Sequence, residues 1–219
     1  MQSVFAINEQ VVRQSICATQ ISLSGDTPDV LTQIFDTQIK LCIFKRAMST
    51  DVQEYSAFLQ QAFQDFRITQ VMSLCQSGDL LNELLPQHHC RQNFIEDILT
   101  VANMFADLFD LEQVGFRLCV LNKAMCPRFH TDKVPCRLIT TYSGKGTEWL
   151  DSRTVKPEMP GISHDEPVYT ELVRQLEAGD VALFKGDAWD DNDGFGVVHR
   201  SPVLSADETR LLLTLDFSC

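Results

Sequence analysis

The spacing of the hydrophobic residues changes near residue 113, and this change limits the folds that the chain can adopt. Before that point, residues 50–66 and 90–113 carry apolar side chains at helical spacing, and residues 40–46 are a predicted strand. After it, the segments are short, β-like and separated by turns rich in glycine and aspartate. The pattern predicts an α+β protein, with helices mainly in the first half and strands in the second.

The ends of two predicted helices can be located from single residues. Residues 50–66 begin with Thr50, an N-cap residue followed three positions later by Gln53, which is typical of a capping box. Residues 77–86 form a shorter helix that ends at Pro86, because proline has no amide hydrogen to continue the helix. Both helices are amphipathic, so we expect them to pack on the rest of the chain.

The second half contains six segments of strand character, which are residues 115–122, 136–142, 147–150, 180–184, 195–199 and 210–217. Many short strands with turns between them are typical of a sandwich, a jelly roll or a barrel. We expect one domain over residues 1–219, in which residues 1–112 form a mainly helical layer against a β-fold of residues 113–219. A long surface loop is expected at residues 151–168.

The charge and the cysteines exclude several classes of protein. The formal net charge of −12 argues against nucleic-acid binding, which needs clustered lysine and arginine. The first residues lack a basic segment followed by an apolar run, and no later window resembles a membrane span. We therefore expect a cytoplasmic protein with no membrane partner. The eight cysteines form no CxxC pair, which argues against a zinc ribbon or a thioredoxin motif.

A candidate metal site is found in the segment CPRFHTDKVPCRL, residues 126–138. His130 and Asp132 are two positions apart, so on an extended segment both side chains point to the same face. His199, at the end of a second apolar segment, is the candidate third ligand. Two histidines and one carboxylate form the facial triad of non-haem Fe(II) oxygenases, which leaves coordination positions open for a bidentate cosubstrate and O₂.

Residues 114–217 resemble the 2-oxoglutarate/Fe(II)-dependent oxygenases. The resemblance is carried by the segment AGDVALFKGDAWDDNDGFGVVHRSPVLSADETRLLLTLDF, with a Gly-Asp turn, an apolar strand, a loop, His199 and a final strand. It implies a double-stranded β-helix core, of the jelly-roll or cupin-like type, and a catalytic triad of the three metal ligands. It also implies that Arg210 binds the far carboxylate of 2-oxoglutarate. Tyr142 is a candidate hydrogen-bond donor to the same cosubstrate.

The segment CPRFHTDKVPCRLITTYSGKGTEWL, residues 126–150, is similar to the signature of a bacterial family filed as domain of unknown function 1826. Membership would cover nearly the whole chain and implies the same architecture, without assigning a reaction. Genes of that family are often neighbours of zinc-homeostasis genes, which implies a setting of metal limitation.

Other interpretations of these residues stay open. Cys126 or Cys136 could join the histidines in a site for Zn²⁺, which accepts sulfur, nitrogen and oxygen ligands, and the chain would then be a non-catalytic zinc-binding protein. Arg210 could instead pair with Asp207 or Glu208, and the β-fold could serve protein contacts without any metal. The segment QHHC, residues 87–90, is interpreted as a surface turn. An acidic loop, Asp187, Asp190, Asp191 and Asp193, is expected to be solvated near the mouth of the site.

Overall fold

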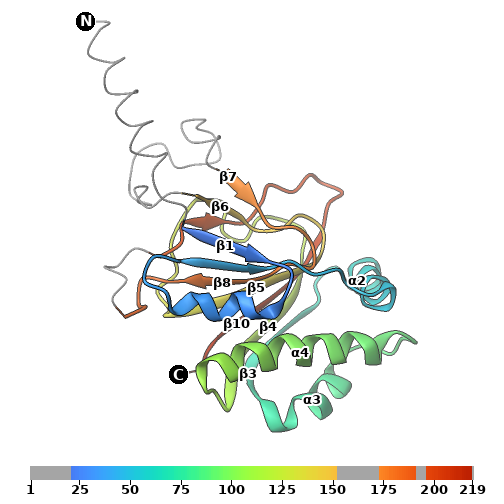
Figure 1. Ribbon diagram of the computed structural model, residues 1–219. Helices are drawn as coiled ribbons and strands as arrows, with labels where there is room; N and C mark the ends of the chain where they lie inside the picture. The colour runs from blue at the N-terminus through green and yellow to red at the C-terminus, as the bar shows by residue number, and fades with distance from the viewer. Residues whose placement is uncertain (1–20, 152–172, 191–195, 219) are drawn as a thin grey trace, which may run out of the picture.

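The computed structural model describes residues 21–151, 173–190 and 196–218. Its strands form one large and one small sheet, and helices cover the face of the large sheet that is turned away from the small one (Figure 1). The mixed α+β class is therefore confirmed. The predicted surface loop lies outside the described residues from residue 152 onward.

The large sheet takes strands from both halves of the chain. Its order is β1 (Ser22–Gly25), β2 (Leu41–Phe44), β8 (Val181–Lys185), β5 (Cys136–Ser143), β10 (Arg210–Phe217), β4 (Gln113–Leu121) and β3 (Arg67–Ser73). Neighbouring strands are antiparallel except β1 and β2, which are parallel. The last strand of the chain, β10, thus lies in the interior of the sheet between β5 and β4.

The small sheet has the order β7 (Val173–Gln175), β6 (Glu148–Leu150) and β9 (His199–Arg200). Apolar side chains fill the layer between the two sheets, among them Phe184 and Leu212 from the large sheet and Trp149 from the small one. We call this layer the intersheet core. It matters for function because His199 and Arg210 border it.

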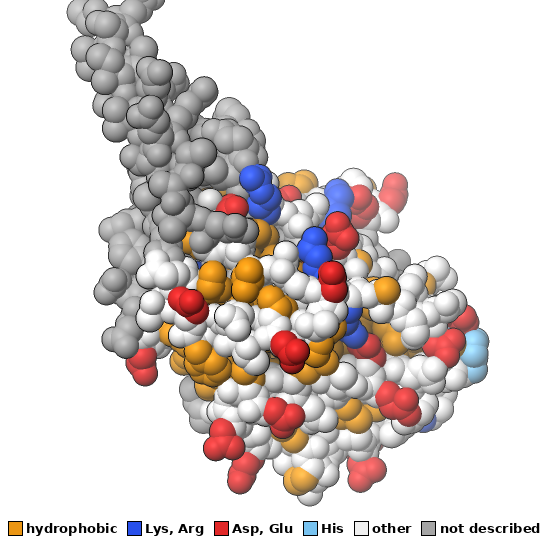
Figure 2. Space-filling view, in the orientation of Figure 1, with side chains coloured by type: hydrophobic (Ala, Val, Ile, Leu, Met, Phe, Trp, Pro, Cys, Tyr) orange, Lys and Arg blue, Asp and Glu red, His pale blue; other side chains and the backbone are white. Residues whose placement is uncertain are grey.

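The helical elements are η1 (Pro28–Phe35), α2 (Thr50–Ala62), η2 (Leu74–Gln76), α3 (Ser77–Leu84) and α4 (Arg91–Phe109). The longest, α4, buries Phe94, Ile98 and Phe105 in a second apolar core that also contains residues of β5, β8 and β10. The three predicted helices are confirmed. Figure 2 shows acidic side chains spread over the part of the surface that α3 and α4 occupy, in keeping with the net charge of −12.

Several predicted boundaries were wrong by a few residues. The N-cap of α2 is Ser49 rather than Thr50, because the Ser49 hydroxyl accepts a hydrogen bond of 3.3 Å from the Val52 N–H. Of the predicted strand 195–199, residue 195 lies outside the described residues, residues 196–198 are not in a strand, and only His199 belongs to β9. Strands β1, β3 and β7 were not predicted. In β3 the buried Ile68 and Met72 alternate imperfectly with exposed polar residues, so the segment carries little strand signal.

No helix among the described residues is both long enough and apolar enough to cross a membrane.

Candidate functional site

His130 and His199 are held side by side by their own backbones. The His130 N–H donates to the His199 carbonyl at 3.0 Å, and the His199 N–H donates to the His130 carbonyl at 2.9 Å. This short antiparallel bridge places the two imidazole ring centres 4.6 Å apart. The structure therefore brings together two residues that are far apart in the sequence, as the prediction of a shared site requires.

Hydrogen bonds to the backbone orient both imidazoles. Nδ1 of His130 lies 3.0 Å from the Arg128 carbonyl, and Nδ1 of His199 lies 2.9 Å from the Val197 carbonyl. A neutral imidazole that donates from Nδ1 has its free lone pair on Nε2, which is the atom available to a metal. Both Nε2 atoms face Asp132, at 3.8 Å from Oδ1 for His130 and 3.3 Å from Oδ2 for His199.

The three predicted ligands therefore form one group, in which the candidate ligand atoms all lie within 4.8 Å of one another. Burial alone would raise the pKa of Asp132, but His199 and Arg137 hold that pKa at about 2. Burial and the neighbouring His199 lower the pKa of His130. At neutral pH the carboxylate is thus ionised and His130 is neutral, the protonation states that a metal ion requires.

Arg137 holds the Asp132 carboxylate in place through a hydrogen bond. Its Nη1 donates to Asp132 Oδ2 at 2.8 Å, while Nε and Nη2 donate to the two carboxylate oxygens of Asp216 at 2.7 and 2.9 Å. Arg137 and Asp216 are cross-strand partners on β5 and β10. Arg137 was not predicted as part of the site, because only the strand register places it next to Asp132.

Asp187 ties the His-x-Asp segment to the loop after β8. The Thr131 hydroxyl donates to Asp187 Oδ2 at 2.7 Å, and the Asp187 N–H donates to the Asp132 carbonyl at 2.8 Å. Gly186 allows this close approach, since a Cβ there would lie 2.0 Å from the Val134 carbonyl oxygen. Asp187 is thus partly buried and bonded within the fold, whereas Asp190 of the same loop is exposed, as expected for a solvated loop. Of the other acidic residues in that loop, Asp191 and Asp193 lie outside the described residues.

Arg210 is a buried cation, and no carboxylate of the described residues forms an ion pair with it. Its side chain is 1 % exposed, and Nη2 donates to the hydroxyls of Thr141 at 2.9 Å and Thr147 at 3.1 Å. Its Nε and Nη1 atoms have no hydrogen-bond partner among the described residues. Burial lowers the pKa of the Arg210 guanidinium to about 10. The alternative pairing with Glu208 is not found, because Glu208 accepts a hydrogen bond from Lys145 at 2.7 Å.

Arg210 and the three candidate ligands border the same interior. Arg210 alternates along β10 with Leu211 and so shares a face with Leu212, a member of the intersheet core. Phe184, in the same core, packs against the His199 ring with ring centres 5.1 Å apart. Three metal-type donors and a guanidinium that has no ionic partner in the described part of the chain therefore border one apolar layer.

The structure does not bring Tyr142 into this group. Its hydroxyl donates to Asp97 of α4 at 2.8 Å, and the side chain is buried in the core on the helical side of the sheet. Its neighbour Thr141 contacts Arg210 instead, since adjacent residues of a strand face opposite sides. The two cysteines are also separate from the ligand group. Cys126 is exposed, and Cys136 is buried in the helical-side core.

The sequence of this chain matches a family described as proteins of unknown function, DUF1826, over residues 25–216. The chain belongs to this family. The match covers almost all described strands and helices, so the DUF1826 resemblance seen in the sequence is confirmed. No curated protein matches the chain.

Solved structures similar to this DUF1826 protein include oxygenases at low sequence identity. A rice dioxygenase for auxin oxidation is 12% identical, with a TM-score of 0.50 over 90% of this chain and 82% of the other. JOX2, solved in complex with 2OG, Fe and JA, is 10% identical, with a TM-score of 0.49 over 91% and 74%. A 2OG-Fe(II) oxygenase family protein from Burkholderia pseudomallei is 10% identical, with a TM-score of 0.46 over 91% and 94%. The likeness to the rice enzyme is one of fold.

Proposed function

We propose that this DUF1826 protein is an Fe(II)- and 2-oxoglutarate-dependent oxygenase, whose two sheets form a double-stranded β-helix. The observation that carries the proposal is the buried guanidinium of Arg210, on the interior that the three metal-type donors border. Two of its nitrogens have no hydrogen-bond partner within residues 21–151, 173–190 and 196–218. A buried cation without an anion is costly, so such a residue favours a site built for an anionic ligand.

The donor set fits the metal. His130, Asp132 and His199 supply two nitrogens and one oxygen, and this facial set leaves coordination positions for a bidentate cosubstrate and for O₂. Bound Fe(II) and 2-oxoglutarate together supply the activation of O₂ that oxidises an unreactive C–H bond. A zinc site with thiolate ligands is less well supported, because neither Cys126 nor Cys136 belongs to the ligand group.

The residues of the chain have separate tasks in this proposal. The carbonyls of Arg128 and Val197 aim the two imidazoles, and Arg137 holds the carboxylate in place. Arg210 binds the distal carboxylate of 2-oxoglutarate, for which a planar guanidinium is suited, and Thr141 and Thr147 orient that guanidinium. The apolar intersheet core excludes water from the same interior, which strengthens these charged contacts.

An anaerobic Fe(II) titration with and without 2-oxoglutarate tests the proposal. We expect a weak visible charge-transfer band in the wild type that needs both additions. The variant Asp132→Ala should lose iron binding, whereas Arg210→Met should bind iron but require far more 2-oxoglutarate. Lys145→Gln, which removes an exposed cation bonded to Glu208, is the matched control and should behave as the wild type. Unchanged iron binding in Asp132→Ala, or no band in the wild type when both Fe(II) and 2-oxoglutarate are present, would contradict the proposal.

A further inference from the structure

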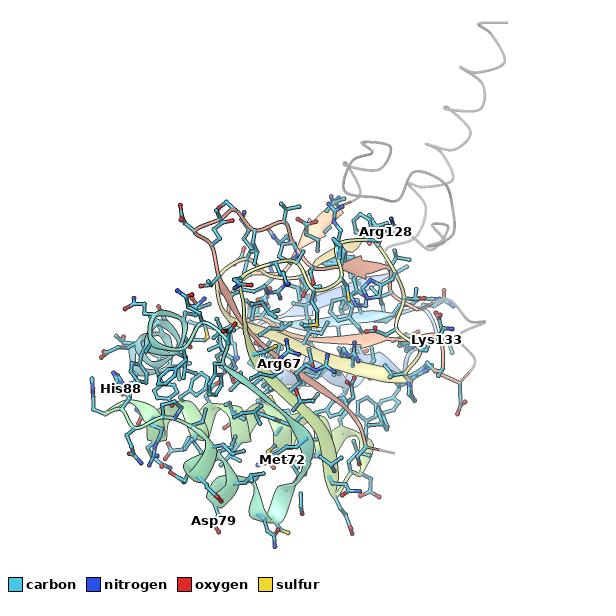
Figure 3. The ribbon with its side chains drawn as sticks, turned by 180° about the vertical axis from the view of Figure 1, so that it is seen from behind. Arg67, Met72, Asp79, His88, Arg128 and Lys133 are labelled. Carbon is cyan, nitrogen blue, oxygen red and sulfur yellow. The ribbon has the colours of Figure 1, made fainter. Side chains whose placement is uncertain are left out.

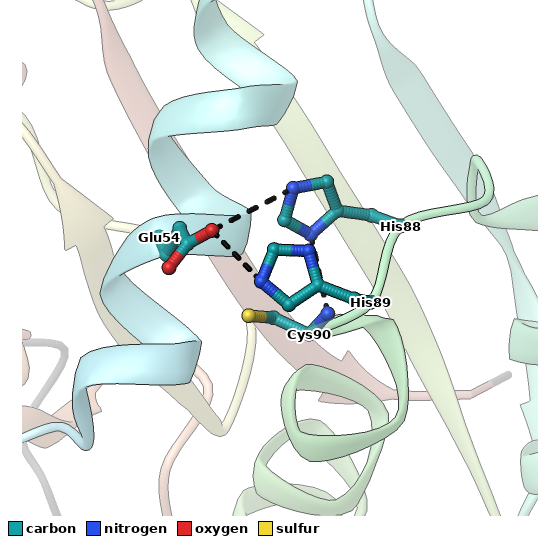
Figure 4. Close-up of side chains that lie close together, drawn as sticks. All are labelled: Glu54, His88, His89 and Cys90. Carbon is teal, nitrogen blue, oxygen red and sulfur yellow. Dashed lines mark hydrogen bonds and ion pairs between the residues drawn. The ribbon is translucent and has the colours of Figure 1, made fainter.

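A second cluster of metal-type donors lies between two helices, in the segment interpreted from the sequence as a surface turn. Glu54 comes from α2, and His88, His89 and Cys90 come from the turn before α4 (Figure 4). One ligand atom from each residue lies within 4.8 Å of the others. Figure 3 shows His88 on the helical side of the molecule, away from Arg128 and Lys133, which flank the segment with His130 and Asp132.

The four side chains converge from separate elements. His89 Nε2 lies 3.0 Å from Glu54 Oε1, and His88 Nε2 lies 3.9 Å from the same oxygen. The two imidazole ring centres are 4.3 Å apart. The Cys90 side chain is buried at the start of α4, and burial together with the nearby carboxylates of Glu54 and Asp51 raises the pKa of its thiol. Imidazole, thiol and carboxylate groups that approach each other this closely are suited to share a cation.

The turn that carries these donors is firmly positioned. The His88 ring stacks on Phe58 with ring centres 4.6 Å apart. The Tyr55 hydroxyl donates to the Pro86 carbonyl at 2.8 Å, and Arg91 Nη1 donates to the Asn82 carbonyl at 3.0 Å. These contacts hold the turn against α2 and α3. The ligand positions therefore do not depend on a metal to bring the backbone segments together.

We infer that Glu54, His88, His89 and Cys90 form a tetrahedral Zn²⁺ site, separate from the His130, Asp132 and His199 group. Zn²⁺ accepts thiolate, imidazole and carboxylate ligands in four-coordinate sites, and a site with four protein ligands is of the structural type. The group with His130 supplies three ligands and no sulfur, so the two sites differ in the metal that they favour. Bound zinc would clamp α2 to the start of α4.

The ligands are expected to contribute unequally. The Cys90 N–H donates to His88 Nδ1 at 3.2 Å, so in the metal-free chain the proton of a neutral His88 is on Nε2. Coordination through Nε2 requires this hydrogen bond to be given up. His89 has no such restraint and is exposed at 73 % of its side chain. Loss of His88 should therefore weaken zinc binding less than loss of His89 or Cys90.

The test uses the full chain with the first site removed by Asp132→Ala and His199→Ala. After chelator treatment we expect this chain to take up one Zn²⁺, measured by metal analysis and by competition with a chromophoric chelator. Co²⁺ added instead should give the near-ultraviolet charge-transfer band of a cobalt–thiolate bond. Adding Cys90→Ser should abolish the band and weaken zinc binding by more than about 100-fold, because outer-shell changes alone cost about 10- to 100-fold.

Two further variants test whether zinc binding depends on the proposed ligands. His89→Ala changes an exposed side chain that the fold does not need, and it should also weaken zinc binding more than His88→Ala does. Cys126→Ser, which replaces a free and exposed cysteine, is the matched control and should leave the cobalt band intact. A band that survives in Cys90→Ser, zinc binding that is unchanged in His89→Ala, or no zinc uptake at all would overturn the inference. Because the first site is absent, failure of the oxygenase proposal would not affect this result.

Discussion

The two donor clusters use similar residue types in opposite surroundings. The first, His130, Asp132 and His199, is held by a β-bridge and faces an apolar interior. That interior also contains Arg210, which forms no ion pair with any residue that the structure describes. The second, centred on Cys90, lies between two helices near the surface and completes its own ligand set with sulfur. The number of ligands and the neighbouring charges, more than the histidines themselves, decide what each cluster can do.

The outer contacts sharpen this difference. In the first cluster the only charged ligand is Asp132, and its ion pair with Arg137 offsets part of that negative charge. In the second, Asp51 adds a further carboxylate beside the thiol. An open site with a nearby cation suits an anionic cosubstrate, whereas a closed, strongly anionic site suits a divalent ion alone. If the two clusters are independent, a substitution in one should leave metal binding at the other unchanged.

The largest effect is expected from Gly186→Ala. A Cβ at this position would lie 2.0 Å from the Val134 carbonyl oxygen and 2.7 Å from that of Asp132, so the backbone must shift. We expect the free energy of unfolding to fall by about 3 kcal/mol or more, and iron binding to be lost. Urea denaturation and Fe(II) titration measure the two effects. Gly78→Ala is the control, since its Cβ would meet only a Leu99 methyl at 3.8 Å.

Zinc binding at Cys90 should survive in the Gly186→Ala variant at temperatures where it remains folded. If the variant lost both zinc and iron binding while its helices stayed folded, the two clusters would be coupled rather than independent.

Arg210→Met should have opposite effects on stability and on cosubstrate binding. Removing a buried guanidinium with two unpartnered nitrogens should raise the free energy of unfolding of the ligand-free chain by about 1–3 kcal/mol. Binding of 2-oxoglutarate should weaken about 100-fold, because a buried charge pair is lost. Thermal unfolding without ligand and calorimetric titration measure the two effects. Arg67→Met, at an exposed arginine of β3, should change neither.

The sequence predicted those parts of the molecule in which the signal is local. The long helix α4 and the strand β10 have regular apolar spacing, and His130 and Asp132 are two positions apart. The edge strands β1 and β3 were missed because they are short or carry many polar residues.

Other parts of the site depend on contacts between distant segments. Arg137 reaches Asp132 only through the pairing of β5 with β10, and Thr147 meets Arg210 across the fold. The segment with Cys90 was interpreted as a turn because it follows the helix-ending Pro86, and its fourth partner, Glu54, lies on another helix. No local pattern in the sequence contains these pairings.

Arg137→Gln tests the support of the first cluster. The Asp132 carboxylate would lose its 2.8 Å hydrogen bond, and Asp216 would lose its bidentate partner. We expect Fe(II) affinity to fall about 10- to 100-fold, the usual cost of removing an outer partner of a metal ligand. Asp216→Asn, which leaves the contact between Arg137 and Asp132, should have a smaller effect in the same titration. Equal affinities in wild type and Arg137→Gln would show that the aspartate does not need this support.

The smallest effect is expected from Tyr55→Phe, which tests the support of the second cluster. The Tyr55 hydroxyl donates to the Pro86 carbonyl at 2.8 Å, two residues before His88. Its loss should lower the free energy of unfolding by about 1 kcal/mol and weaken zinc binding several-fold, because the turn is held less firmly. Tyr142→Phe removes a hydroxyl that donates to Asp97 on the same helical side, and it should leave zinc affinity unchanged. If both variants weakened zinc binding equally, the cause would be general loosening of the helical layer rather than the turn at His88.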